Sequence, residues 1–129
     1  MVLLVSSFFV VGFYYLYLNN VAISNRFFRN IQSGNQQIKV VEVKIPRGSA
    51  ENVHINFVPA EIIIQIGVNN TVRWVNEDDD WHTAHSNLPE FYSDLIQPGA
   101  NFTHTFETPG IYPYHCDPHP WMTGIIIVK

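Results

Sequence analysis

The chain has 129 residues, of which 47% are hydrophobic, and a formal net charge of −4. Residues 1–38 carry only two arginines, whereas residues 39–129 carry five lysines or arginines against eleven aspartates or glutamates. This acidic balance argues against nucleic-acid binding and against electrostatic adhesion to an anionic membrane, and a single cysteine excludes an internal disulfide.

The chain begins with an uncharged apolar run at residues 2–18 (VLLVSSFFVVGFYYLYL). Its length is near the lower end of the roughly 17–25 residues that cross a bilayer as a helix, and three tyrosines cluster at its far end. A cleaved signal peptide is the alternative, but a basic n-region and an A-x-A site are both missing. We therefore expect a membrane anchor at 1–20, a polar connector at 21–37 and a folded domain at 38–129.

The folded domain has the composition of β-structure. Short β-branched or alternating segments recur between Pro and Gly turns, which is typical of a sandwich or barrel. We predict strands at 38–45, 56–58, 61–66, 71–75, 101–106, 111–114 and 124–129. The segments 61–66 and 71–75 are expected to pair as a hairpin, and 87–100 to be a long loop with one helical turn around 90–95. The predicted core consists of Val41, Val43, Ile55, Phe57, Ile62, Ile64, Val72, Trp74, Phe102, Phe106, Tyr112, Tyr114, Ile126 and Val128.

The only cysteine lies in the segment 112–124 (YPYHCDPHPWMTG). Cys116 is followed at short spacing by His119 and then by Met122. A thiolate, an imidazole and a weak, distant thioether are three of the four ligands of a trigonal copper site. The segment therefore indicates copper, provided that a second imidazole is supplied from elsewhere.

That second imidazole must come from another loop, because three ligands within seven residues cannot close around a metal alone. The acidic segment 76–86 contains two candidates, His82 and His85. Prolines at positions 118 and 120 fix the backbone at two points of the cysteine loop, so we expect this loop to be stiff before metal binds.

The segments 112–124 and 74–85 (WVNEDDDWHTAH) resemble those of the cupredoxins, the blue-copper family, and most specifically the amicyanin/plastocyanin-like branch. The resemblance covers nearly all of residues 55–129. The spacing Cys-x-x-His-x-x-Met is that of amicyanins, whereas plastocyanins place the methionine further away. The resemblance implies an all-β, Greek-key β-sandwich or barrel that binds one type 1 copper ion, Cu(I) or Cu(II). The ligands that it implies are His82, Cys116, His119 and, in the axial position, Met122.

Two positions beside the first ligand depart from the family pattern. The family often places Pro before this His and Asn after it, whereas this chain has Trp81 and Thr83. The Asn normally ties the two ligand loops together, and Thr83 could replace it through its hydroxyl. The acidic run 77–80 is also unusual; we read it as a solvated loop, with a docking patch or a weak hard-cation site as alternatives. We expect His54, His85, His104 and His115 to be surface or strand residues.

We expect a one-electron carrier, tethered through residues 2–18, rather than an enzyme, since the sequence offers no general base, nucleophile or substrate pocket. In this family the second His ligand reaches the surface through an apolar patch, and here Pro118, Pro120 and Trp121 would surround His119 as a dock for redox partners. We expect the copper domain to lie outside the cytoplasm, in the periplasm or on the outer cell surface. The alternatives are a copper enzyme whose open axial position binds a small molecule such as nitric oxide, and a copper-delivery protein or structural subunit of a membrane oxidase.

Overall fold

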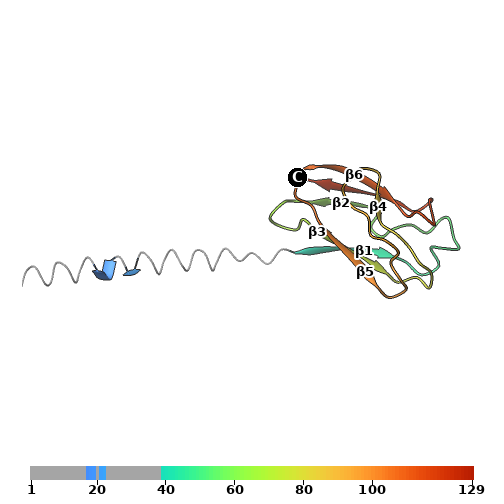
Figure 1. The fold of residues 1–129 in the computed structure, drawn as a ribbon, viewed down its shortest axis with the longest axis horizontal. Coiled ribbons are helices and arrows are strands. Elements are labelled where there is room, and N and C mark those ends of the chain that lie inside the picture. The colour runs from blue at the N-terminus through green and yellow to red at the C-terminus, as the bar shows by residue number, and fades with distance from the viewer. Residues whose placement is uncertain (1–16, 20, 23–38) are drawn as a thin grey trace, which may run out of the picture. The chain divides into compact units, whose positions relative to one another are not determined.

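A computed structural model describes residues 17–19, 21–22 and 39–129 of the chain. Within these residues there are seven β-strands, which all belong to one compact unit, Gln37–Lys129 (Figure 1). The strands are β1 (Val40–Ile45), β2 (Glu61–Ile64), β3 (Thr71–Asn76), β4 (His85–Ser86), β5 (Asn101–Thr105), β6 (Gly110–His115) and β7 (Thr123–Val128). The prediction of an all-β domain is therefore confirmed.

The strands form two sheets that face each other (Figure 1). One has the order β1-β3-β5 and the other the order β2-β7-β6-β4. The pairs β1–β3 and β2–β7 are parallel, and the remaining pairs are antiparallel. From β1 to β6 the chain changes sheet at every connection, and only β6 and β7 are consecutive strands that pair directly. The domain is thus a sandwich whose loops repeatedly cross from one layer to the other.

The predicted hairpin between residues 61–66 and 71–75 is wrong, because β2 and β3 belong to different sheets. Asparagine side chains stabilise the crossing between them. The Gln65 N–H donates to Asn69 Oδ1 at 2.8 Å, and the buried Asn70 donates through Nδ2 to the Phe106 carbonyl at 2.7 Å. The second bond attaches the crossing to the end of β5, so that β3 pairs with β5 instead of turning back on β2.

The core lies between the sheets and is centred on Trp74. Its ring lies 5.1 Å from that of Phe91 and 5.6 Å from that of Tyr114, measured between centroids. Most of the predicted core is confirmed as buried, whereas Val41 and Phe102 are partly buried and pack against it. Ile55 is also only partly buried. Apart from the predicted ligands Cys116 and Met122, the core contains four apolar residues that the sequence analysis missed, which are Ile45, Ala84, Phe91 and Ile96.

Two predicted elements are not found in the described part of the chain. No helical turn forms around residues 90–95. Phe91 and Ile96 are buried instead, so this segment extends across the core and contributes apolar side chains to it. The predicted strand at 56–58 is reduced to a single bridge, in which Val58 pairs with β1.

The predicted membrane anchor at residues 2–18 lies outside the described residues except for Tyr17 and Leu18. Among the residues that the structure describes, none form a helix with the length and apolar character needed to span a bilayer. The anchor and the connector that follows it therefore stay predictions.

Candidate metal centre

The predicted ligands come from two loops, and these loops meet in space. Residues 77–84 connect β3 to β4 and contain His82, and residues 116–122 connect β6 to β7 and contain the other three ligands. His82 is held by a backbone bridge to Ile96, with N–H to carbonyl distances of 3.2 Å and 2.7 Å. The His82 side chain therefore projects from a fixed backbone position.

The 116–122 loop is closed by its own backbone hydrogen bonds. The Cys116 N–H donates to the Met122 carbonyl at 3.1 Å, and the Met122 N–H donates to the His119 carbonyl at 2.9 Å. Below the loop, β6 and β7 pair in register up to the last residues before it. Together with the two prolines, these bonds support the prediction that the loop is stiff before metal binds.

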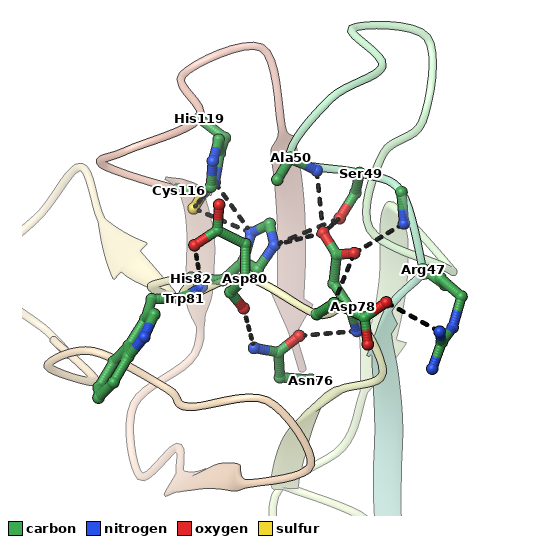
Figure 2. A network of polar contacts seen from close by, with 12 residues as sticks. Arg47, Ser49, Ala50, Asn76, Asp78, Asp80, Trp81, His82, Cys116 and His119 are labelled. Carbon is green, nitrogen blue, oxygen red and sulfur yellow. Dashed lines mark hydrogen bonds and ion pairs between the residues drawn. The ribbon is translucent and has the colours of Figure 1, made fainter.

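Three of the four predicted ligands converge with their donor atoms facing one another (Figure 2). The Cys116 Sγ lies 3.5 Å from His82 Nδ1 and 3.6 Å from His119 Nδ1, and the two ring nitrogens are 3.1 Å apart. His82 and Cys116 are inaccessible to solvent, and His119 is 8% exposed. This is a buried triangle of two imidazole nitrogens and one sulfur, the donor set of a trigonal copper site.

The protonation of the triangle suits a metal. Burial raises the pKa of the Cys116 thiol, although hydrogen bonds from Thr83 and His119 oppose this shift. The thiol is therefore protonated in the metal-free protein, and a bound ion would displace that proton. Burial and the neighbouring His82 lower the pKa of His119, which favours the neutral imidazole that binds metal. Met122, the predicted axial ligand, is fully buried in the same loop.

The buried carboxylate of Asp78 orients the His82 ring from the side away from the triangle (Figure 2). Asp78 Oδ2 lies 2.9 Å from His82 Nε2 and also accepts from the Ala50 N–H at 2.9 Å, while Oδ1 accepts from the Gly48 N–H at 2.7 Å. Because a carboxylate can only accept, His82 must carry its proton on Nε2, and Nδ1 keeps a lone pair for the metal.

The electrostatics of Asp78 agree with this role. Burial acts to raise its pKa, but hydrogen bonds from Gly48, His82 and Ala50 outweigh burial and hold the pKa well below its ordinary value. Asp78 therefore stays ionised. The sequence analysis assigned it to a solvated loop and missed this contact, although its spacing of four residues before His82 was a signal that could have revealed it.

Thr83 ties the two ligand loops together, as the sequence analysis considered. Its hydroxyl accepts from the Asp117 N–H at 2.8 Å and donates to Asp117 Oδ2 at 3.2 Å. Its own N–H donates to the Cys116 sulfur at 3.3 Å. The threonine thus makes the link between the two loops that the resemblance assigns to an asparagine.

The structure does not bring the other histidines into the triangle. His85 lies in β4 and contacts Asp117 at 2.9 Å, and His115 lies opposite it in β6. His104 lies in β5 of the other sheet, and His54 is exposed in the loop before β2. The expectation that these four are strand or surface residues agrees with their positions.

A family model described as a cupredoxin-like domain matches residues 13–128. The chain belongs to the cupredoxin family. Cupredoxins bind one type 1 copper ion, and the buried nitrogen–nitrogen–sulfur donor set described above fits that ion. The predicted copper cofactor is therefore confirmed.

Relatives of this cupredoxin include amicyanins, which confirms the branch that the sequence resembles. Amicyanin from Paracoccus denitrificans is 31% identical over 71 residues, which cover 51% of this chain and 54% of that protein. Amicyanin-alpha from Methylorubrum extorquens is 30% identical over 91 residues, covering 65% of this chain and 75% of that protein. The chain thus spans about half the length of the Paracoccus relative and three quarters of the other.

Solved structures of cupredoxins share the fold. A purple cupredoxin from Nitrosopumilus maritimus matches with a TM-score of 0.63 and 30% identity, covering 69% of this chain and 99% of that one. An amicyanin variant in its Cu(I) form matches with a TM-score of 0.59 and 23% identity, covering 70% of this chain and 82% of that one. The second likeness supports the cupredoxin sandwich alone.

Proposed function

We propose that this protein carries single electrons through one type 1 copper ion bound by His82, Cys116 and His119, with Met122 as the axial ligand. The observation that carries the proposal is the buried convergence of three donor atoms within 4.8 Å of one another. Membership of the cupredoxin family supports it. The donor positions are held by Asp78 and by backbone hydrogen bonds, so we expect the site to change little between oxidation states, which favours fast electron transfer.

His119 is the route by which electrons would enter and leave. Its ring is the partly accessible member of the triangle, and Pro118 and Pro120 beside it are exposed. The Trp121 ring lies 5.3 Å from the His119 ring and is held by an indole N–H bond to the Ser49 carbonyl at 3.1 Å. These side chains form an apolar rim on which we propose that redox partners dock.

The docking proposal can be tested by electron self-exchange between copies of the protein, measured from NMR line broadening in mixtures of the two oxidation states. Pro120→Glu places a charge on the rim, so we expect slower self-exchange with an unchanged copper spectrum. Pro109→Glu, an exposed control before the opposite end of β6, should leave the rate unchanged. Equal rates in all three proteins would contradict the docking surface.

We also propose that residues 2–18 tether the protein to a membrane, with the copper domain outside the cytoplasm. The uncharged run in the sequence supports this proposal. Protease treatment of intact cells should remove the C-terminal domain. Complete protection of that domain would contradict its placement outside the cytoplasm.

The copper site itself is tested by titrating the purified chain with copper and recording visible absorption and EPR. One equivalent of copper should give an intense thiolate-to-copper band and a narrow hyperfine splitting. Cys116→Ser should abolish the band, and His82→Ala should remove or strongly alter it, whereas His85→Ala should leave it nearly intact. If His85→Ala removes the band and His82→Ala does not, the ligand assignment is wrong.

A second candidate function is a copper site with an open axial position that reacts with a small molecule such as nitric oxide. The likeness to a purple cupredoxin favours testing it, since colour reports the axial ligand. A blue protein would support Met122 as a weak axial ligand and a carrier. A purple or red protein whose spectrum changes on addition of nitric oxide would support the open site.

A further inference from the structure

A second group of metal-binding side chains lies outside the copper triangle. His85 of β4 and His115 of β6 are directly paired in the antiparallel ladder, and Asp117 lies two residues after the end of β6. The two imidazole rings stack with their centroids 5.3 Å apart. His85 Nδ1 lies 2.9 Å from Asp117 Oδ1, and His115 Nε2 lies 3.1 Å from the same oxygen. Two imidazoles and one carboxylate therefore converge within 4.8 Å.

Asn87 fixes the orientation of the His115 ring. The His115 Nδ1–H donates to Asn87 Oδ1 at 2.6 Å. Nε2 is then the nitrogen left for a second partner, and it lies 3.1 Å from Asp117 Oδ1. A histidine whose second nitrogen is held by a hydrogen bond is the usual arrangement of a metal ligand.

We propose that His85, His115 and Asp117 bind one divalent transition-metal ion of the zinc class, with water completing the coordination. Zinc bonds of about 2.0–2.2 Å place tetrahedral ligand atoms about 3.3 Å apart. The observed separations of 2.9 Å and 3.1 Å are within a few tenths of an ångström of that value. The side chains are 41%, 33% and 39% exposed, so an ion reaches them without unfolding of the domain.

The zinc-class site is linked to the copper ligands through Thr83. The Thr83 hydroxyl donates to Asp117 Oδ2, while its N–H donates to the sulfur of Cys116. A divalent cation on Asp117 replaces a negative charge beside the copper ligands with a positive one, which disfavours Cu(II) relative to Cu(I). Zinc binding should therefore raise the copper reduction potential. This coupling rests on the proposed copper function, whereas zinc binding does not.

The test is a calorimetric titration of the full copper-loaded chain with zinc(II), followed by measurement of the visible spectrum and reduction potential. One equivalent of zinc should bind with retention of the thiolate-to-copper band. His85→Ala and His115→Ala should each weaken zinc binding by about 100-fold or more, because even partners that only orient a ligand contribute about 10–100-fold. Asn87→Ala keeps both imidazoles and should weaken zinc binding by about 10–100-fold, because Asn87 only orients a ligand.

His104→Ala is the matched control, since His104 also pairs with a carboxylate, Glu90, at 3.2 Å but lies in the other sheet. It should bind zinc as the unaltered chain does. Three outcomes would overturn the proposal. They are the absence of zinc binding to the unaltered chain, zinc binding that survives all three site variants, and zinc uptake that bleaches the copper band. If no coloured copper site forms, the same zinc titration on the Cys116→Ser chain separates the copper proposal from the zinc proposal. Zinc binding to that chain that depends on His85 and His115 supports the zinc-class site alone.

Discussion

Asp78→Asn is the substitution that most directly tests how the first histidine ligand is positioned. The asparagine has nearly the same shape, but one carboxylate oxygen becomes an NH2 donor. If that NH2 faces the ligand, the Ala50 N–H loses its acceptor and His82 Nε2 must give up its proton. The proton then moves to Nδ1, the atom that faces the copper triangle. If the NH2 faces the other way, the N–H groups of Gly48 and Asp79 lose their acceptor instead.

The magnitude follows from these contacts. Asp78 is 5% exposed and accepts from the N–H groups of Gly48, Ala50 and Asp79, at 2.7 Å, 2.9 Å and 2.9 Å. A hydrogen bond to a charged group contributes about 1.5–3 kcal/mol, and a buried donor left without a partner costs about 1–3 kcal/mol. We therefore expect the free energy of unfolding of the metal-free variant to fall by about 3 kcal/mol. Copper affinity should fall about 10–100-fold, as for other groups that orient a ligand.

Urea unfolding of the metal-free chain and copper competition against a chelator measure the two effects. The control is Asp79→Asn, whose carboxylate is 73% exposed and pairs with Arg47 on the surface. Such an exposed pair contributes about 0–1 kcal/mol, so the control should resemble the unaltered protein. If Asp78→Asn matches the control in both measurements, our reasoning about the tautomer of His82 is refuted.

The pH dependence of this effect has a defined sign. The pKa of Asp78 is lower in the folded chain than its ordinary value of 3.8. Its contribution to stability is therefore fully present above that ordinary value and is lost as the pH falls toward the folded pKa. We would measure the free energy of unfolding of the unaltered chain and of Asp78→Asn in urea at a series of pH values. The difference between the two values should be constant near neutrality and should become smaller below about pH 4. A difference that widens in acid would contradict this sign.

Three further substitutions test the packing around the site. Thr83→Val removes the acceptor of the Asp117 N–H, so urea unfolding should show that the free energy of unfolding falls by about 1–2 kcal/mol. Thr83→Ser keeps the hydroxyl and should avoid this loss, and equal losses in the two variants would contradict the role of the hydroxyl. Gly124→Ala places a methyl group against the Tyr114 ring, and this overpacking should lower the free energy of unfolding by about 1–3 kcal/mol. An unchanged midpoint of urea unfolding would show that the ring moves aside freely. Tyr114→Phe removes a buried hydroxyl that has no hydrogen-bond partner among the described residues. The free energy of unfolding in urea should therefore stay equal or rise by about 1 kcal/mol. A clear fall in this free energy would show that the hydroxyl has a hydrogen-bond partner.

The proposed copper ligands were accessible to sequence reasoning because three of them lie within seven residues. Local spacing identified Cys116, His119 and Met122 as one group, and the family resemblance chose between His82 and His85. The structure gathers the first two of these with His82 and places His85 elsewhere. The spacing of four residues between Asp78 and His82 was a local signal of their contact, whereas the backbone N–H groups that hold Asp78, about 30 residues earlier in the chain, leave no local pattern.

The fold was predicted at the level of strands but not of sheets. Alternation specifies which side chains of a segment face inward, and most of the core follows from it. It does not specify which layer a strand joins, so residues 71–75 were paired with the wrong neighbour. Phe91 and Ile96 lie in a segment without a strand period, and only packing against the sandwich shows them to be core.

The place of β7 in its sheet has a consequence for biosynthesis. This strand lies between β2 and β6, so the four-stranded layer cannot close until residue 128 has left the ribosome. The same strand also fixes the far end of the 116–122 loop, since this loop ends where β7 begins. A nascent chain arrested before that point presents a lone thiol and separate imidazoles rather than a copper site. Assembly of the proposed copper site therefore depends on the pairing of β7 with β2 and β6.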